Sequence, residues 1–344
     1  MTEAAVQARH LSVTAIGGLE NMELCTSQLG EPGPGEAVAR VAAAGVSYGD
    51  LLLRLGVIPG GPKPPFTPGY DFAGVVEQLG PGVSGLSVGQ EVAALVPTGG
   101  YADRVLIAAD RLVPRPTGAE PVESAAVALN YFIAHQMLHR VAEVRPGQRI
   151  LVHGASGGVG VAFLQLAELA GIECHGSASK SKLDLVTKFG AHPIDYRAED
   201  FVKVIRALPG GTVHAVFDAI GGSHFNRSSS VLAKGGILVG YGQSAVLVNG
   251  KPNMLIGARG FLGGIMLPKL VPNGKRSVFY NAWSLEKTQP QAYREDLTAV
   301  LQLLADGKIV PPVAKTLPLE GAADAQRMLE QGSVTGKIVL TTGA

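Results

Sequence analysis

Apolar residues in the first third of the chain occur in short runs of strand length, separated by turns rich in glycine and proline. The clearest runs are Glu36–Ala43, Gly74–Leu79 and Glu91–Leu95. One short helix is predicted within Tyr48–Gly56. The Pro-rich segment Pro59–Pro68 is predicted to be a loop, because proline lacks a backbone N–H and fits neither a helix interior nor a central strand. This part of the chain therefore predicts a β-rich domain.

The pattern changes near Glu120, where a long helix is predicted over Ser124–Val141 and strands then alternate with helices. The predicted strands are Arg149–His153, Glu173–Ser177, Pro193–Tyr196, Val213–Ala219 and Gly236–Tyr241. The predicted helices between them are Val159–Ala170, Lys182–Phe189 and Glu199–Leu208. Such alternation builds βαβ units, in which parallel strands form one sheet with helices on both faces. We therefore expect an α/β fold with a doubly wound parallel sheet.

The C-terminal tail is expected to return to the β-rich domain, since the parallel sheet is complete before the tail begins. Helices are predicted over Arg294–Leu304 and Leu319–Gln331, with the Pro-rich segment Val310–Pro318 between them and a last strand at Gly336–Leu340. Upstream, the apolar run Ser277–Leu285 has the character of an exposed edge strand, which is prone to pair with another chain. Pairing with a two-fold mate would continue the sheet, so a homodimer is expected.

Composition limits the classes of function. The chain has 344 residues, of which 46% are hydrophobic and 17% charged, and its formal net charge is +1. A large core is therefore expected, and neither nucleic acid nor a membrane is an expected partner. No stretch is long and apolar enough to span a bilayer, and Met1–His10 lacks a signal-peptide pattern. Two cysteines, Cys25 and Cys174, make neither a disulfide framework nor a four-cysteine zinc site. We expect a cytoplasmic protein with a small-molecule substrate.

A glycine-rich motif, Gly154-Ala-Ser-Gly-Gly-Val-Gly160, follows a predicted strand and opens a predicted helix. In that context glycines allow a tight turn and a close backbone approach, while N–H groups at the helix end face the diphosphate of a dinucleotide. The candidate contacts are Gly154, Ser156, Gly157, Gly158, Val159 and Gly160. The alternative is a glycine-rich turn without a ligand, which the surrounding βαβ pattern disfavours.

The end of the second predicted strand indicates which cofactor binds. A site for NAD usually has Asp or Glu about 20 residues beyond the motif, bonded to the ribose 2′-OH. Here residues 176–182 contain no carboxylate and offer Ser177, Ser179, Lys180 and Lys182. Hydroxyl and ammonium groups suit a 2′-phosphate, so NADPH is predicted. The alternative is that both lysines only begin a solvated helix, but lysine there opposes the helix dipole.

The sequence resembles a known family, the medium-chain dehydrogenase/reductase superfamily, and within it the branch of quinone oxidoreductases and vesicle-amine-transport-like proteins. The resemblance covers nearly the whole chain. The segments that carry it are Gly45–Asp50, Pro68–Gly74, Leu129–Tyr131, Gly154–Gly160, Ile194–Arg197, Phe217–Gly221 and Gly336–Leu340.

The resemblance implies a GroES-like β-rich catalytic domain, residues 1–130 and 287–344, and a Rossmann NADPH-binding domain, residues 131–286. In related proteins, the residues that match Lys182 and Tyr196 hold the 2′-phosphate of the adenosine. The middle of the glycine motif faces the pyrophosphate. Tyr241 and Gln243 match the segment beside the nicotinamide.

The resemblance also bears on metal binding, because zinc alcohol dehydrogenases of this superfamily use Cys, His and Cys or Glu ligands. Ser47 stands where the first Cys would be, and Gly69-Tyr70-Asp71 stands where Gly-His-Glu would be. A hydroxyl and a phenol do not make a zinc site, so no metal is expected. His135 and His139 have the i, i+4 spacing of helical metal ligands but no acidic or thiolate partner nearby, so ordinary helix histidines are expected.

Ser47 and Tyr48 are the predicted catalytic residues. Ser47 matches a family position that approaches the nicotinamide, and both side chains can donate a hydrogen bond while being poor acids at neutral pH. Asp50 and Arg54, four residues apart on a predicted helix, are expected to form a salt bridge. A tyrosine that donates a proton in related enoyl-thioester reductases is replaced by Ile58 in the best alignment, which weakens that function.

Together these features predict a zinc-independent, NADPH-dependent reductase that transfers hydride to a quinone or to an electron-poor C=C bond of an enone. Two alternatives stay open. One is an enoyl-thioester reductase or dehydrogenase of a biosynthetic pathway, and the other is an NADPH-binding protein without catalysis. Turnover of NADPH with quinones, enones and acyl thioesters distinguishes the three.

Overall fold

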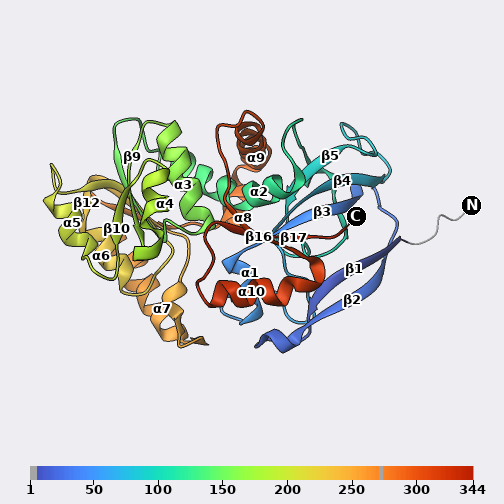
Figure 1. The fold of residues 1–344 in the computed structure, drawn as a ribbon, viewed down its shortest axis with the longest axis horizontal. Helices are drawn as coiled ribbons and strands as arrows, with labels where there is room; N and C mark the ends of the chain where they lie inside the picture. Colours follow the sequence, from blue (N-terminus) through green and yellow to red (C-terminus); the bar gives the residue numbers. More distant parts are fainter. Residues whose placement is uncertain (1–5, 271–273, 344) are drawn as a thin grey trace, which may run out of the picture. The chain divides into compact units, whose positions relative to one another are not determined.

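The computed structural model describes residues 6–270 and 274–343. The chain forms two compact units (Figure 1). Unit 1 combines Met1–Phe132 with Gln289–Ala344, and unit 2 is the intervening segment Ile133–Thr288. Among the described residues, no helix has the length and apolarity that a membrane crossing requires.

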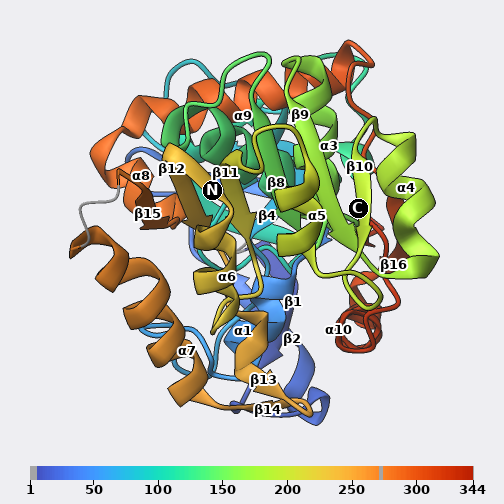
Figure 2. The same cartoon turned by 90° about the vertical axis from the view of Figure 1, so that its left-hand side faces the viewer.

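Unit 2 is built on one parallel sheet of six strands in the order β10-β9-β8-β11-β12-β15 (Figure 2). Its strands are β8 (Arg149–His153), β9 (Glu173–Ala178), β10 (His192–Asp195), β11 (Val213–Asp218), β12 (Leu232–Gly240) and β15 (Arg276–Phe279). The chain order reverses between β8 and β11, which is the point where open α/β sheets bind ligands at the carboxyl ends of their strands. The predicted doubly wound parallel sheet is confirmed.

Helices cover both faces of this sheet. One face carries α3 (Gly158–Leu169) and α4 (Leu183–Lys188), and the other carries α5 (Phe201–Ala207) and α6 (His224–Ser230), as Figure 2 shows. The remaining helices of unit 2 are α7 (Met254–Gly260) and α8 (Ala282–Thr288). The long helix predicted over Ser124–Val141 is α2 (Pro121–His135), continued by a π-helical turn, Gln136–Val141.

Unit 1 is built on a mainly antiparallel sheet in the order β16-β17-β3-β4-β5-β7, with β6 also paired to β3. Its strands are β3 (Glu36–Val46), β4 (Asp71–Leu79), β5 (Glu91–Leu95), β6 (Arg104–Ala108), β7 (Val113–Pro114), β16 (Val313–Pro318) and β17 (Lys337–Thr341). A separate pair joins β1 (Val6–Val13) to β2 (Met22–Leu29). The helices of unit 1 are α1 (Tyr48–Arg54), α9 (Pro290–Ala305), α10 (Ala322–Glu330) and most of α2, which continues into unit 2 after Phe132. Because β17 pairs with β3, Ile338 opposite Val46, the predicted return of the tail is confirmed.

Two sequence predictions need correction. The run Ser277–Leu285 was predicted as one edge strand, but only β15 is extended, and α8 begins at Ala282. Asn281 ends the extended stretch, because its side-chain oxygen accepts a hydrogen bond from the N–H of Trp283. The Pro-rich segment Val310–Pro318 contains strand β16, which was not predicted. Proline is tolerated there because β16 is the end strand of its sheet.

Candidate functional site

The glycine loop of unit 2 connects β8 to α3 and has the backbone that its sequence requires. Gly154 has φ +72°, in the left-handed region that favours glycine. A Cβ on Gly160 would lie 2.2 Å from the carbonyl oxygen of Gly154, so only glycine lets the helix start so close to the turn. Ser156 is buried beneath the loop.

The first turn of α3 offers backbone N–H groups without a side-chain cap. Gly157 is the N-cap residue in extended conformation, and no side chain accepts a hydrogen bond there. Gly158 and Val159 follow as the first helical residues of this twelve-residue helix. The first N–H groups of a helix have no partner within it, and together with the helix dipole they attract an anion. The loop and helix end therefore fit the diphosphate of a dinucleotide.

The carboxyl ends of β9 and β10 lie together, because Tyr196 donates its N–H to the carbonyl of Ala178. The turn after β9 brings Ser179, Lys180 and Lys182 to this place, and the N–H of Lys182 bonds to the carbonyl of Ser179. Lys180 is exposed and Lys182 is half-buried, and partial burial lowers the pKa of Lys182. Tyr196 is 55% exposed. Two cations and a phenol thus gather where the sequence predicts a phosphate.

Tyr241 and Gln243 lie beyond the end of β12. The N–H of Tyr241 bonds to the carbonyl of Asp218, which ties the ends of β11 and β12 together. Gly221 approaches this segment so closely that a Cβ there would lie 3.0 Å from the Cα of Gln243. Burial raises the pKa of Tyr241, with the charge of Asp218 adding to the effect, so its phenol stays protonated at neutral pH.

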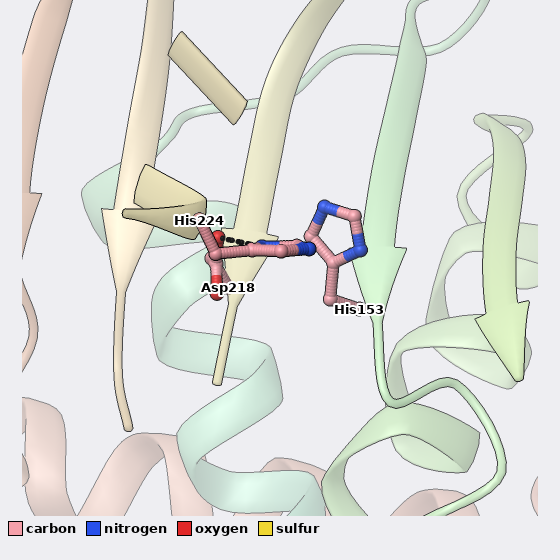
Figure 3. Close-up of side chains that lie close together, drawn as sticks. All are labelled: His153, Asp218 and His224. Carbon is pink, nitrogen blue, oxygen red and sulfur yellow. Dashed lines mark hydrogen bonds and ion pairs between the residues drawn. The ribbon is translucent and has the colours of Figure 1, made fainter. Parts of the chain in front are cut away.

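A polar network that joins the ends of β8, β9 and β11 to α6 was not predicted. His224 Nδ1 lies 2.8 Å from Asp218 Oδ2, and the His153 ring stands beside His224 at 4.3 Å between centroids (Figure 3). Ser228 donates to Asp218 Oδ2 at 2.7 Å and lies 3.3 Å from His153 Nε2. His153 Nδ1 in turn lies 2.9 Å from the hydroxyl of Ser177.

The directions of these hydrogen bonds follow from the protonation states. Burial lowers the pKa of His153 to about 3, so its ring is neutral. The proton of Ser228 points to Asp218, so Ser228 accepts from His153 Nε2–H. His153 Nδ1 then accepts the proton of Ser177. The hydroxyl proton of Ser177 therefore points to His153.

The predicted catalytic residues belong to unit 1, where Ser47 begins α1. Its hydroxyl donates to Asp50 Oδ2 at 2.9 Å, and Asp50 also accepts from the N–H of Ser47, the N–H of Gly69 and the hydroxyl of Tyr101. Asp50 is fully buried, and burial raises its pKa although these bonds lower it. Tyr48, 39% exposed, has a pKa raised by partial burial and by the charge of Glu330.

The predicted Asp50–Arg54 salt bridge is wrong. The Arg54 guanidinium bonds instead to Glu330, to Gln326 Oε1 at 2.7 Å and to the carbonyl of Gly17. Helix spacing favoured the local pair, but residues nearly three hundred positions away supply better-placed acceptors.

The residues at the zinc-ligand positions of the resembled family do not match a zinc site. The hydroxyl of Ser47 is bonded to Asp50, and Tyr70 is a phenol whose pKa is raised by burial and by the charge of Asp50. Asp71 Oδ2 accepts from Lys337 Nζ at 3.2 Å and from the N–H of Leu129. A carboxylate paired with an ammonium group is a poor zinc ligand beside two neutral oxygens.

Potential metal ligands gather elsewhere. Within residues 6–270 and 274–343, two groups of three such side chains have ligand atoms within 4.8 Å of one another. The strand-end cluster is His153, Asp218 and His224, and the sheet-edge cluster is Glu173, His175 and His192. His135 and His139 pack with ring centroids 4.7 Å apart but belong to neither cluster.

A Rossmann-type sheet in one unit and a GroES-like sheet in the other define the class: an oxidoreductase of the dehydrogenase/reductase type. The family described as alcohol dehydrogenase GroES-like domain matches residues 33–117. The family described as zinc-binding dehydrogenase matches residues 189–340. The first match lies within unit 1, and the second begins in unit 2 and continues into the C-terminal part of unit 1.

Comparison with similar proteins identifies the branch of this class to which the chain belongs. The synaptic vesicle membrane protein VAT-1 homolog of Danio rerio is 33% identical over 339 residues, 97% of this chain and 70% of that protein. The quinone oxidoreductase of Escherichia coli, solved with NADPH, is 26% identical with a TM-score of 0.85, covering 97% of this chain and 100% of that one. The CurK enoyl reductase is 25% identical with a TM-score of 0.82, covering 98% and 99%. The chain belongs to the medium-chain dehydrogenase/reductase superfamily, in the branch of quinone oxidoreductases and VAT-1-like proteins.

Proposed function

We propose that the protein is an NADPH-dependent reductase that transfers hydride to a quinone or to an electron-poor C=C bond, without zinc. The observation that carries the proposal is the turn after β9, which follows a dinucleotide-type glycine loop and holds Lys180 and Lys182 where NAD-binding proteins have a carboxylate. The similar Escherichia coli quinone oxidoreductase was solved with NADPH, which supports the choice of cofactor.

The proposed cofactor contacts divide by position. Gly154, Ser156 and the Gly157–Gly160 turn would hold the diphosphate, and Tyr241 with Gln243 would flank the nicotinamide. For the 2′-phosphate the proposal rests on Ser179, Lys180, Lys182 and Tyr196. Ser177 was expected among these, but its proton is directed to His153, so it is assigned the role of fixing the end of β9. Bound NADPH would supply the hydride.

A catalytic zinc at the family's ligand positions is excluded because Ser47, Tyr70 and the Lys337-paired Asp71 do not form a ligand set. Without a metal to stabilise an alkoxide, alcohols are poor substrates. Quinones and conjugated enones tolerate this, because their own conjugation spreads the negative charge that develops on the acceptor.

The contribution of the protein would then be mainly proximity and orientation of the acceptor. The hydroxyl of Ser47 donates its proton to Asp50 in a hydrogen bond. Its main role would therefore be to hold the start of α1, and it would not protonate the substrate. Tyr48 is partly exposed, and its raised pKa makes it a hydrogen-bond donor and a poor acid. Water would supply the proton that completes the reduction.

Two further candidates stay open. The CurK enoyl reductase has a similar structure, which favours an enoyl-thioester substrate as the alternative. A binding protein that holds NADPH without turnover is the other. Oxidation of NADPH measured with a panel of quinones, enones and acyl thioesters separates them. Turnover of thioesters alone contradicts the first proposal, and binding without turnover of any acceptor favours the third.

Cofactor choice has its own test. Lys182→Glu places a carboxylate beside the proposed 2′-phosphate, so the KM for NADPH should rise at least about tenfold more than the KM for NADH. Lys188→Glu, a charge reversal on the exposed end of α4, is the matched control and should change neither constant. A wild-type protein that uses NADH as well as NADPH contradicts the proposal.

We also propose that two copies pair through β15. This strand ends the sheet order of unit 2, so among the described residues no strand of that sheet pairs with its outer edge. Pairing about a two-fold axis would join two six-stranded sheets. Light scattering should give the mass of a dimer at micromolar concentration, and a monomer contradicts it. The cytoplasmic location expected from the sequence stays a prediction that cell fractionation can test.

A further inference from the structure

The two clusters of potential metal ligands in unit 2 differ in how many of their ligand atoms already form hydrogen bonds. In the strand-end cluster, both nitrogens of His153 bond to serines. Asp218 Oδ1 accepts two backbone N–H groups, and its Oδ2 accepts from His224 and Ser228. His153 and Asp218 are also buried almost completely. A metal there would have to break a closed hydrogen-bond network, so this cluster is not a metal site.

The sheet-edge cluster has a different geometry. His175 on β9 and His192 on β10 are directly opposite in the register, and their rings stack at 4.7 Å between centroids. Glu173, two residues before His175, is on the same face of β9, and its Oε1 lies 3.0 Å from His175 Nε2. Three potential metal ligands from two neighbouring strands therefore converge at the edge of the sheet.

Open ligand positions remain in this cluster. Glu173 Oε1 accepts from Arg149 Nε at 2.8 Å as well as from His175, but no described residue donates to Glu173 Oε2. The ring nitrogens of His192 have no hydrogen bond to any described residue, and His192 is exposed. One carboxylate oxygen and one imidazole are thus available beside the buried His175.

The protonation states also suit a cation. Hydrogen bonds from Arg149 and His175 hold the pKa of Glu173 at about 2, so it is a carboxylate throughout the physiological range. A metal ligand nitrogen must carry no proton, so an ion bound at His175 Nε2 would replace the hydrogen bond from that nitrogen to Glu173 Oε1. The Arg149 contact would remain as an outer partner of the carboxylate.

We propose that the sheet-edge cluster binds one divalent transition-metal ion, with Zn²⁺ as the best match, through Glu173, His175 and His192. Two imidazoles and one carboxylate form a common zinc ligand set, and water would complete a tetrahedron. Zinc bonds of about 2.0–2.2 Å place neighbouring ligand atoms about 3.4 Å apart. The ligand atoms of the three side chains lie within 4.8 Å of one another. Glu173 Oε1 and His175 Nε2, now 3.0 Å apart, would separate slightly to admit the ion, and the exposed His192 would move toward it.

This site is separate from the positions that bind zinc in the resembled dehydrogenases and is independent of the proposed reductase function. It would fasten the edge strand β10 to β9, and β10 leads to Tyr196. Because the ion would bind the folded unit only, it would raise the melting temperature of unit 2.

The experiment titrates the metal-free full-length protein with Zn²⁺ by calorimetry and with Co²⁺ by visible absorption. The wild type should bind one equivalent of Zn²⁺, and Co²⁺ should give the strong absorption of a tetrahedral site. His192→Gln removes one ligand from the surface and should weaken Zn²⁺ binding at least about tenfold, since even losing an outer partner costs 10–100-fold. Glu173→Gln should also weaken Zn²⁺ binding, which gives a second variant on β9, whereas His192 is on β10.

Two matched histidine variants complete the design. His10→Gln, on β1 of unit 1, and His224→Gln, in the strand-end cluster, should bind Zn²⁺ as the wild type does. The proposal is overturned if the wild type takes up no stoichiometric Zn²⁺, or if His192→Gln binds it unchanged. Binding that His224→Gln abolishes would also overturn it, because the ion would then belong to the strand-end cluster.

Discussion

Asp71 in unit 1 and Asp218 in unit 2 are both fully buried, but their partners differ and their pKa values shift in opposite directions. In unit 1, Asp71 accepts from Lys337 and from the N–H of Leu129, while among described residues nothing donates to its Oδ1. Burial raises its pKa to about 6, although Lys337 lowers it. In unit 2, burial also raises the pKa of Asp218, but hydrogen bonds from His224 and Ser228 and the nearby imidazoles hold it at about 2.

Burial alone does not separate the two groups, because both are fully buried, and the pKa of Asp218 is lowered by the hydrogen bonds and imidazoles around it. The number of donors alone does not decide the direction either, because Asp50 accepts four hydrogen bonds and its pKa is still raised. The hydrogen-bond donors to the Asp218 carboxylate all come from the next ten residues of the chain. Asp71 depends on Lys337, which lies 266 positions away on β17. The charge balance of unit 1 therefore exists only when the C-terminal strand has joined its sheet.

The largest expected effect comes from removing the counter-charge of Asp71. Lys337→Met leaves a fully buried carboxyl without its cation, and breaking a buried pair in this way costs about 3–5 kcal/mol. The free energy of unfolding of unit 1, measured by hydrogen exchange of β3 and β4, should fall by that amount. The double variant Asp71→Asn with Lys337→Met should recover part of the loss. A single variant within 1 kcal/mol of the wild type would contradict the comparison.

Acid should affect the two units in opposite ways. Burial lowers the pKa of His153 to about 3 from an ordinary 6.5, so between these values the unfolded chain takes up a proton that folded unit 2 does not. Stability is then lost as pH falls, by about 3 kcal/mol from pH 6 to pH 4. Asp71 has a raised pKa, so its contribution to unit 1 increases as pH falls through 6 and is lost as pH rises. Asp218 adds to the acid loss only below pH 4.

Unit 2 can be followed separately, because the only tryptophan of the chain, Trp283, lies in it. Denaturant titrations read by Trp283 fluorescence at pH 4–7 should show the acid loss in the wild type. His153→Gln should flatten the profile, while His10→Gln, in unit 1, should leave it unchanged. If His153→Gln lost as much stability at low pH as the wild type does, titratable groups other than His153 would be the cause.

A smaller effect is expected from one donor of Asp218. Ser228 is fully buried and donates to Asp218 while accepting from His153, so Ser228→Ala leaves both groups with one partner fewer. Losing a hydrogen bond to a charged group costs about 2 kcal/mol. Ser230→Ala, two residues later on the exposed side of α6, is the matched control and should cost less than about 0.5 kcal/mol. Equal losses of stability in Ser228→Ala and Ser230→Ala would show that the hydrogen bonds of Ser228 to Asp218 and His153 are not the cause.

The sequence predicted the parts of this molecule that local pattern determines. Alternating apolar runs and helices predicted the parallel sheet, and the last strand was assigned correctly to the β-rich unit. The glycine loop was found because its spacing is local. Strand β16 was missed because prolines normally exclude a strand, and only its place at the end of the sheet makes them acceptable.

Side-chain networks could not be predicted, because their partners meet only after folding. His153 and Asp218 are 65 positions apart and become neighbours only because β8 and β11 pair. The Asp50–Arg54 pair failed for the same reason, since Gln326 and Glu330 reach Arg54 from α10. The motifs at Gly154 and at Phe217–Asp218 predict where strands end, but they do not predict which of these ends become neighbours in the sheet.

The smallest expected effect concerns Ser47, the counterpart in unit 1 of Ser228. Ser47 caps α1 and donates to Asp50, so Ser47→Ala should cost about 1 kcal/mol of stability. If the proposed function holds, its kcat should fall less than the roughly 10²–10⁴-fold typical of a lost general acid, and Tyr48→Phe should behave in the same way. The wild-type kcat should also stay flat from mildly acidic to mildly basic pH. The measurement is steady-state turnover of NADPH with the best quinone or enone acceptor. A loss of several thousandfold in either variant, or a steep pH limb, would show that one of these hydroxyls is a true proton donor despite the hydrogen bond that ties Ser47 to Asp50.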